Sequence, residues 1–271
     1  MLVSRSDQIG AGIVRMGVHE LAVSEVIWRL TGPEDLDVDI GANYGYFTGL
    51  MAARAREVIG VEPNPQVIRF LVSNRLRWGA ASEKVQLDFR AVSDRTGTAL
   101  LHLPCAFESN HGLATLASTE DVLEDYEVET VTIDQIVAGR QVGVMKIDIE
   151  GHELAAFHGA SETLAGELIR DIVFEDHESL PSPVSTLLED AGFSIFGIDQ
   201  TFLGPKLIPP GWPPRGWDAP NYLATRRPRD AQALIKRRGW RVLYPHLRGL
   251  CGRASTPPIT GKGERGCSEV L

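Results

Sequence analysis

The sequence has little of what marks secreted, disulfide-stabilised or membrane-spanning proteins. Its 271 residues include only three cysteines, Cys105, Cys251 and Cys267, which are too few and too scattered for a disulfide framework or a cysteine-rich zinc site. No apolar run reaches the roughly 18 residues that a membrane span needs, and the first residues lack the apolar segment of a secretory signal. From these absences we expect a cytoplasmic protein.

Basic residues are also scarce over most of the chain. Residues 1–225 hold 16 Lys and Arg against 33 Asp and Glu, whereas residues 226–271 hold 11 against 3, and the net charge of the whole chain is −9. An acidic surface repels phosphates, so nucleic acid is not an expected partner. Apolar residues at 43% and charged residues at 23% are typical of a folded protein with a sizeable core. We expect one domain with extensions.

Short apolar segments alternate with helical patterns along the chain. Segments that predict strands lie at residues 36–40, 57–62, 85–92, 99–103, 129–133, 143–149 and 172–175, and residues 193–198 and 221–225 are expected to close the sheet as a hairpin. Helical patterns lie at residues 17–30, 48–55, 65–76, 153–164 and 183–191. This alternation predicts a mostly parallel sheet with helices on both faces. Ligands bind such sheets outside the carboxyl ends of the strands, where Asp39, Glu62, Val92, Asp148 and Glu175 stand.

A glycine-containing turn follows the first strand. It reads Asp-Ile-Gly-Ala-Asn-Tyr-Gly over residues 39–45, and glycines there permit a tight turn and the close approach of a ligand. Glu62 ends the next strand, where an acid accepts hydrogen bonds from ribose hydroxyls. Asn43 stands where a dinucleotide site usually has its second glycine, and Asp39 would repel a pyrophosphate. The turn therefore favours S-adenosylmethionine, which carries positive charge, over NAD.

Four motifs together resemble a known family. VDIGANYGYFT, GVEPNP, RAVSD and VMKIDIEGHE, in this order and spacing, are similar to the FkbM-type methyltransferases, S-adenosylmethionine-dependent enzymes that mostly methylate oxygens of sugars and small natural products. The resemblance covers roughly residues 17–225. It implies an α/β fold of the class I methyltransferase type, Rossmann-like and doubly wound, with a mostly parallel seven-stranded sheet and helices on both faces.

The same resemblance implies a division of the chain and a cofactor site. The expected parts are an N-terminal helical extension (1–35), the methyltransferase domain (36–225) and a basic, partly disordered tail (226–271). The methionine part of the cofactor would lie at the glycine turn, the ribose on Glu62 and the adenine against the backbone of Ala91 and Val92. The residues expected to contact the cofactor are Asp39, Gly41, Ala42, Asn43, Gly45, Phe47, Glu62, Asn64, Ala91, Val92 and Asp148, although burial in the core is the preferred interpretation of Phe47.

Transfer of a methyl group to an alcohol usually needs a base that takes the hydroxyl proton. The candidates are Asp148, His152, Glu175 and His177. We expect Asp148 and Glu150 to point to opposite sides if the strand continues, so that only Asp148 faces the cofactor. The structural alternative is a helix cap for Asp148 and an exposed loop histidine for His152.

Lys146 lies inside an apolar strand and needs a partner, for which Asp148 and Glu175 are the candidates. A metal at these carboxylates is not expected, since no zinc motif is present and methyl transfer requires no metal.

Two further segments hold candidate residues. His111 either reaches over the pocket or stands in a turn. Trp212 and Trp217, in a proline-rich segment read as an irregular loop (205–220), either stack on an acceptor or cover the sheet edge.

The preferred function is O-methylation of a hydroxyl on a small metabolite. The alternatives are N- or carboxyl-methylation on the same fold, an NAD-dependent oxidoreductase, and a catalytically silent binding module. The expected partner is a small hydroxylated acceptor, with neither nucleic acid nor membrane, and a homodimer stays open.

In the tail, a short basic helix is expected at residues 231–243. It is either solvated or used by a phosphate-bearing acceptor or a carrier protein.

Overall fold

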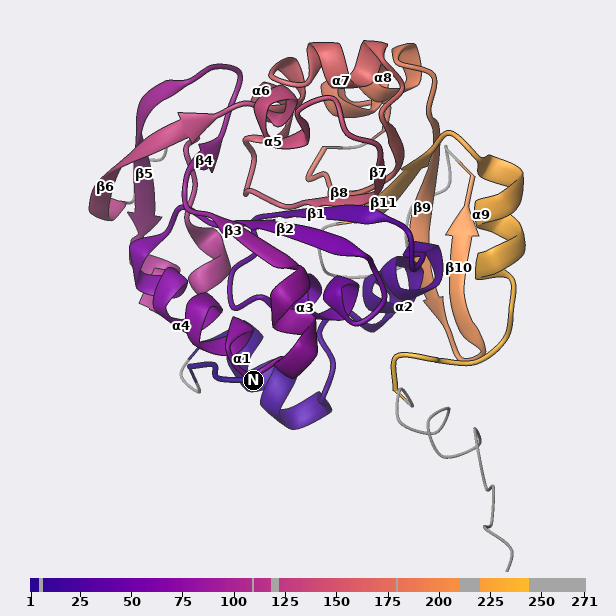
Figure 1. Cartoon of the computed structure of the whole chain (residues 1–271), viewed down its shortest axis with the longest axis horizontal. Helices are drawn as coiled ribbons and strands as arrows, with labels where there is room; N and C mark the ends of the chain where they lie inside the picture. Colours follow the sequence, from indigo (N-terminus) through magenta and orange to yellow (C-terminus); the bar gives the residue numbers. More distant parts are fainter. Residues whose placement is uncertain (5–6, 109, 118–121, 179, 210–219, 244–271) are drawn as a thin grey trace, which may run out of the picture.

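A computed structural model describes residues 1–4, 7–108, 110–117, 122–178, 180–209 and 220–243 (Figure 1). The main sheet has the order β10-β9-β11-β8-β7-β1-β2-β3. Its strands are β1 (Leu36–Ile40), β2 (Glu57–Val61), β3 (Val85–Asp88), β7 (Val142–Ile147), β8 (Ile169–Glu175), β9 (Ser194–Thr201), β10 (Gly204–Ile208) and β11 (Asn221–Thr225). Strands β3, β2, β1, β7 and β8 run parallel, and β11 is antiparallel to both β8 and β9. The alternating pattern therefore predicted the parallel half of this sheet correctly.

Helices cover both faces of the sheet, and each face has its own apolar core. Helices α2 (Leu21–Leu30), α3 (Tyr46–Ala52) and α9 (Pro228–Ile235) contribute to one core, with Val144, Val173 and Leu223 from the sheet. Helices α5 (Ile133–Val137), α6 (Glu153–His158), α7 (Ser161–Ala165) and α8 (Pro183–Asp190) contribute to the other. Strand β7 is buried along its whole length, which explains its continuous apolar sequence.

The expectation of seven strands is wrong, because the main sheet has eight and is mixed. Residues 204–208 of the supposed proline-rich loop form β10, which pairs with β9 and ends the sheet on that side. Pro205 is compatible with this place because an edge strand does not need every N–H for pairing. The pairing expected between residues 193–198 and 221–225 is present, with β10 inserted between them in the sequence.

Three expected strands belong to a second, three-stranded sheet. It consists of β4 (Ala91–Val92), β6 (Val122–Val131) and β5 (Gly97–Pro104). The strand expected at 85–92 is thus divided, and between its parts Asp88 turns back to accept hydrogen bonds from the backbone and side chain of Arg90. The small sheet stands beside helix α4 (Pro65–Arg75) and encloses a separate apolar cluster around Leu101, Leu103 and Phe107.

Several helices differ from expectation. Residues 8–16 form α1 (Gln8–Met16), begun by the Asp7 side chain, which accepts the N–H of Gly10, and ended by Gly17 in a left-handed conformation. The helix expected at 153–164 is divided at Gly159, and the basic helix expected at 231–243 is instead α9. No helix in the described ranges is long and apolar enough to cross a membrane.

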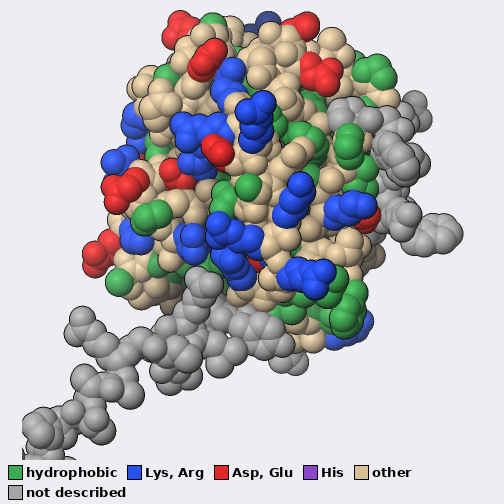
Figure 2. All heavy atoms as spheres, turned by 90° about the vertical axis from the view of Figure 1, so that its right-hand side faces the viewer, with side chains coloured by type: hydrophobic (Ala, Val, Ile, Leu, Met, Phe, Trp, Pro, Cys, Tyr) green, Lys and Arg blue, Asp and Glu red, His purple; other side chains and the backbone are tan. Residues whose placement is uncertain are grey.

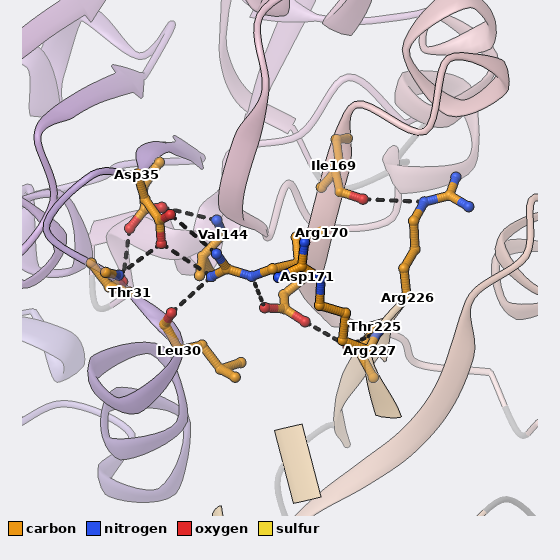
Figure 3. Close-up of polar contacts among 12 residues, drawn as sticks. Leu30, Thr31, Asp35, Val144, Ile169, Arg170, Asp171, Thr225, Arg226 and Arg227 are labelled. Atoms are coloured by element: carbon orange, nitrogen blue, oxygen red, sulfur yellow. Dashed lines mark hydrogen bonds and ion pairs between the residues drawn. The ribbon is translucent and has the colours of Figure 1, made fainter. Parts of the chain in front are cut away.

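The amino-terminal edge of the parallel strands is tied together by Arg170 (Figure 3). Its guanidinium donates to both carboxylate oxygens of Asp35 at 3.1 Å, to the carbonyl of Leu30 at 2.8 Å and to Asp171 at 2.8 Å. Asp171 accepts a second hydrogen bond, at 2.6 Å, from the hydroxyl of Thr225. Arg170 thereby links β8 to the end of α2 and to the residue before β1, and Asp171 continues the link to β11, so this edge supports the sheet structurally.

Candidate active site

A pocket lies at the carboxyl ends of β1, β2 and β7. Nine of the sequence-predicted residues line it: Gly41, Ala42, Asn43, Phe47, Glu62, Ala91, Val92, Asp148 and His152. The other predicted residues, Asp39, Gly45, Asn64, Glu175 and His177, are not among its lining residues. The strand ends therefore converge as the alternation of strands and helices indicated.

The glycine turn is closed by hydrogen bonds within the protein. The N–H groups of Gly41 and Ala42 both donate to the carbonyl of Val61, at 3.0 and 2.9 Å, and the N–H of Gly45 donates to Ala42 at 2.7 Å. Gly41 has a φ of 82°, and a Cβ there would lie 1.9 Å from the carbonyl oxygen of Asp148. Glycine is required at this position because the backbone after β7 passes directly over it.

Glu62 is fixed at the end of β2 by two backbone groups. One carboxylate oxygen accepts the N–H of Asn43 at 2.7 Å, and the other accepts that of Asn64 at 2.9 Å. Burial raises the pKa of Glu62 to about 7, although the two N–H groups oppose this shift. Each carboxylate oxygen retains a further lone pair, so Glu62 can still accept two hydroxyl groups from the pocket side.

Two buried oxygens at this edge have no hydrogen-bond partner within the described structure. They are Oδ1 of Asn43, which lines the pocket, and Oδ1 of Asp39, which is fully buried near the end of β1. The other carboxylate oxygen of Asp39 accepts the hydroxyl of Thr48. Burial raises the pKa of Asp39 despite the charge of Lys146 and the Thr48 hydrogen bond. Unsatisfied buried acceptors are costly in a folded protein and indicate a ligand that donates hydrogen bonds.

Gly45 and Asn64 have structural roles. Gly45 adopts a φ of 83° before α3, and a Cβ there would meet the side chain of Leu71 at 2.6 Å. Asn64 caps α4, because its side-chain oxygen accepts the N–H of Gln66 at 2.9 Å. Its amide nitrogen is buried without a partner in the described structure. Both residues shape the turns that carry the pocket rather than its lining.

Asp148 stands in a charged cluster at the end of β7. The ammonium of Lys146 lies 3.0 Å from its carboxylate and 4.8 Å from the ring centre of Phe47. Burial disfavours ionisation of Asp148, but the charge of Lys146 and hydrogen bonds from Lys146 and Glu175 outweigh burial and lower its pKa. Burial and the neighbouring Asp148 raise the pKa of Glu175, so Glu175 is protonated near neutral pH and donates to Asp148. The partner of Lys146 is therefore Asp148.

Glu150 lines the same pocket as Asp148, so the expectation that the two point to opposite sides is wrong. Strand β7 ends at Ile147, and Glu150 and Gly151 have φ angles of 52° and 89°. Residues two positions apart share a face of a strand, so alternation gave no ground for that expectation, and the chain has in any case left the strand before Glu150. Burial and the charge of Asp148 raise the pKa of Glu150 to about 7. A carboxyl group with this pKa can take up a proton at neutral pH.

The two histidine candidates lie in different surroundings. His152 lines the pocket, with its Nε2 3.0 Å from the hydroxyl of Ser93, and burial lowers its pKa. The side chain of His177 is 57% exposed, and its Nε2 lies 3.9 Å from Glu175 and 4.0 Å from Glu150. His152 is therefore beside the segment expected to face adenine, whereas His177 lies at the rim of the acidic cluster.

Part of the pocket comes from residues that the sequence analysis did not single out. Ile9 and Ile13 of α1 line it, together with Leu101 of β5 and with Leu116. His19 also lines it, and burial and the charge of Lys146 lower its pKa to about 4. The i, i+4 spacing of the two isoleucines between Asp7 and Gly17 is a helix signal that could have been found. The position of His19 depends on tertiary packing and carries no such signal.

Some residues that the sequence analysis singled out lie outside the part of the chain that the structure describes. Trp212, Trp217 and the side chain of His111 lie outside the described residues, as does the part of the tail beyond residue 243. Within the described part, no three His, Cys, Asp or Glu side chains are arranged to hold a metal ion.

Comparisons with known proteins agree with the motifs. The family model described as the methyltransferase FkbM domain matches residues 39–195. The hexuronic acid methyltransferase AglP of Haloferax volcanii is 25% identical over 186 residues, which cover 67% of this chain and 69% of that protein. The chain is therefore similar to a curated methyltransferase over most of both lengths.

Solved structures of methyltransferases are similar at low sequence identity. The FkbM methyltransferase of Methylobacillus flagellatus is 16% identical, with a TM-score of 0.45, and the match covers 71% of this chain but only 44% of that one. A S-adenosylmethionine-dependent O-methyltransferase of Thermotoga maritima is 14% identical, with a TM-score of 0.49 and coverages of 79% and 69%. On the evidence of the family match, which spans more than half of its length, the chain belongs to the FkbM methyltransferase domain family.

Proposed function

We propose that the chain transfers a methyl group from S-adenosylmethionine to a hydroxyl oxygen of a small metabolite. The observation that carries the choice of cofactor is the distribution of donors and acceptors at the glycine turn. The N–H groups of Gly41, Ala42 and Asn43 are already used within the protein, whereas Oδ1 of Asn43 and the carboxylate of Glu62 can still accept hydrogen bonds.

This distribution suits a ligand that donates hydrogen bonds and carries positive charge. The amino group and ribose hydroxyls of S-adenosylmethionine are donors, and its sulfonium is a cation. A pyrophosphate needs free N–H groups at such a turn and would lie close to Asp39. The turn therefore supports S-adenosylmethionine and speaks against the NAD-dependent oxidoreductase.

When bound, S-adenosylmethionine supplies a methyl group that is already activated by the positive sulfur. The work of the protein is then to position the acceptor and to manage its proton. Glu62 and the turn around Asn43 would hold the ribose and the amino-acid end. Ala91 and Val92, with His152 nearby, would contact the adenine.

Glu150 is the residue that we assign as the base for the acceptor hydroxyl. Its pKa of about 7 allows it to accept a proton at neutral pH. Asp148, ionised by its contact with Lys146, would orient the acceptor, and protonated Glu175 would hold Asp148 in place. His177 lies near both glutamates at the rim, where it can contact the far end of an acceptor. His152 is the alternative base.

The carboxyl groups that line the pocket also favour one kind of acceptor group over another. The relative from Haloferax volcanii is named for a hexuronic acid, a sugar that offers both hydroxyl groups and a carboxylate. Glu62, Asp148 and Glu150 surround the pocket with carboxyl groups, which repel an anionic acceptor group at close range. We therefore favour a hydroxyl over a carboxylate as the methylated group.

Calorimetry and product analysis test this proposal. We expect the purified full chain to bind S-adenosylmethionine and S-adenosylhomocysteine but not NAD. A matched set of acceptors, namely a hexose, its hexuronic acid and its amino sugar, should then separate hydroxyl, carboxyl and nitrogen methylation by the mass and base stability of the product. Binding of NAD alone, or of no adenosyl compound, would exclude methyl transfer, and a base-labile product formed only from the hexuronic acid would show that the carboxylate is methylated.

A further inference from the structure

A second concavity lies at the β10 end of the main sheet, between the edge strand β10 and helix α9. Four cationic side chains line it: Lys206 of β10, and Lys236, Arg237 and Arg238 just after α9. All four are exposed, and none has a side-chain hydrogen bond or ion pair with another described residue. No Asp or Glu in the described ranges lines it. The site is thus a concave cluster of uncompensated positive charge.

The positive charge of this face contrasts with the rest of the protein. Lys and Arg side chains predominate across the middle and lower part of the side that carries β10 and α9 (Figure 2). The chain as a whole has a net charge of −9. A negatively charged surface would therefore attract this face of the protein and repel its other faces. The protein would bind such a surface in one orientation.

The cationic segment is held rigidly by a buried ion pair of α2. Arg29 is 5% exposed, pairs with Glu25 at 2.6 Å and donates to the backbone carbonyls of Ile235, Arg237 and Gly239. The second oxygen of Glu25 accepts the N–H of Val242 at 2.9 Å. Residues 235–242 therefore have a defined path, and their charges are organised before any partner binds.

An apolar tip stands beside these charges. Phe202, in the turn between β9 and β10, is 96% exposed, and the next residue, Leu203, is 50% exposed. The carbonyl of Leu203 accepts the N–H of Gly239 at 2.8 Å, and that of Phe202 accepts the indole N–H of Trp240 at 3.4 Å. The turn is thus tied to the cationic segment. An exposed aromatic and an exposed aliphatic side chain beside a cluster of Lys and Arg are typical of a protein that rests on an anionic lipid surface.

We propose that this face docks the protein on anionic membranes, with lipid phosphates in the concavity between β10 and α9 and with Phe202 and Leu203 among the headgroups. The expectation of no membrane partner followed from the absence of a spanning segment, which surface docking does not need. Strand β9 runs parallel to β8, so the Phe202 turn lies at the same edge of the sheet as the carboxyl ends of the parallel strands. Docking would hold that edge toward the lipid.

Co-sedimentation of the full chain with vesicles tests the proposal. We expect binding to vesicles of phosphatidylglycerol in phosphatidylcholine and little binding to phosphatidylcholine alone. Neutralising two cations, Lys236→Gln with Arg238→Gln, should weaken binding about 30-fold, since each cation near such a surface contributes about 1 kcal/mol. Phe202→Ser should weaken it about tenfold by removing a partly inserted ring.

The matched control is Arg56→Gln with Arg95→Gln, which removes the same charge from two exposed positions outside the concavity. It should leave binding within about threefold of wild type, since these cations lie off the docking face. Equal loss in both double variants, no wild-type binding, or binding to polyglutamate but not to vesicles would overturn the proposal. Affinity for S-adenosylmethionine should stay unchanged in every variant, so a failure here is distinguishable from a failure of the proposed function.

Discussion

The two edges of the parallel sheet use the same residue types in opposite ways. At the amino-terminal edge, both oxygens of Asp37 accept hydrogen bonds, from Thr31 and Val144, and both oxygens of Asp171 accept them from Arg170 and Thr225. At the carboxyl-terminal edge, one oxygen of Asp39 and the amide oxygen of Asn43 have no partner in the described structure. Burial alone therefore does not distinguish the two edges, whereas the count of satisfied acceptors does.

This contrast has a physical basis. A carboxylate whose acceptors are all occupied has nothing left to offer a ligand, and it contributes to stability because its partners are already in place. An unsatisfied buried acceptor lowers stability until a ligand supplies the donor. We therefore expect changes at the amino-terminal edge to act on stability, and changes at the carboxyl-terminal edge to act mainly on cofactor binding.

The largest expected effect is that of Arg170→Ala. This change leaves Asp35 and the buried Asp171 without their shared cation, and because the Arg170 side chain is 23% exposed the loss should lie below that of a fully buried pair, at about 2–3 kcal/mol. Urea denaturation should show this loss in the free energy of unfolding. The fraction that remains folded should bind S-adenosylmethionine as wild type does. A loss below about 1 kcal/mol would contradict the structural role of Arg170.

The second largest effect is expected for Gly41→Ala, and Gly139→Ala is its matched control. Both glycines have positive φ angles, 82° and 73°, so both variants incur roughly 1 kcal/mol of backbone strain. Only at Gly41 would the new Cβ meet a backbone oxygen, whereas nothing lies within 4 Å at Gly139. Calorimetry should show a further loss of about 1–3 kcal/mol and weakened cofactor binding for Gly41→Ala alone. Equal effects in both variants would mean that the close approach of Asp148 is unimportant.

Glu62→Gln should lower cofactor affinity, and it should also cost stability because the new NH2 group faces one of the two backbone N–H groups that donate to the carboxylate. The amide replaces a charged acceptor by a weaker one, and hydrogen bonds to charged groups contribute about 1.5–3 kcal/mol. Affinity for S-adenosylmethionine should therefore fall by roughly tenfold to a hundredfold in isothermal titration. Unchanged affinity would show that the ribose does not bind there.

The same variant should change the pH dependence of stability. Burial raises the pKa of Glu62 from its ordinary value of 4.5 to about 7 in the folded protein, so the folded state holds a proton that the unfolded state releases. The associated stability is fully present below about pH 4.5 and is lost as the pH rises through 7. Subtracting the Glu62→Gln curve of unfolding free energy from the wild-type curve should leave a falling slope of up to about 1.4 kcal/mol per pH unit in this window. A flat difference would contradict the burial of the charge.

The smallest expected effect is that of Glu57→Gln, also at the amino-terminal edge. Glu57 pairs with Arg140 at 2.8 Å, but the two side chains are 26% and 38% exposed. Water screens such pairs, and the change should cost less than about 1 kcal/mol. A loss as large as that of Arg170→Ala would show that position at this edge, rather than burial of the pair, sets the energy.

The sequence predicted the parallel strands and the acids at their ends because both depend on local patterns. A buried strand such as β7 is a continuous apolar run, and the turn at Gly41 needs a residue type that few other positions need. The second sheet could not be told from the main one, since a strand's sequence does not say which sheet it joins. Strand β10 was missed because Pro205 lies within it and more prolines follow it in the sequence, and such prolines usually indicate a loop.

The acceptor side of the site was harder to predict because it depends on distant contacts. Glu150 lies in the turn that follows Ile147, and the hydroxyl of Thr115 holds that turn by donating to the carbonyl of Glu150 at 2.7 Å. His19 reaches Lys146 through the packing of α2 on the sheet. Neither contact leaves a pattern of neighbouring residues in the sequence.

The Arg29–Glu25 pair of α2 connects the N-terminal part of the chain to residues 235–242. Both residues precede the range matched by the family model, and the carbonyls that Arg29 binds and the N–H that Glu25 accepts come after it. Deleting the first 35 residues would therefore release a segment some 200 positions away, although every residue of that segment would remain. The first 35 residues therefore support a segment that lies beyond the family domain in the sequence.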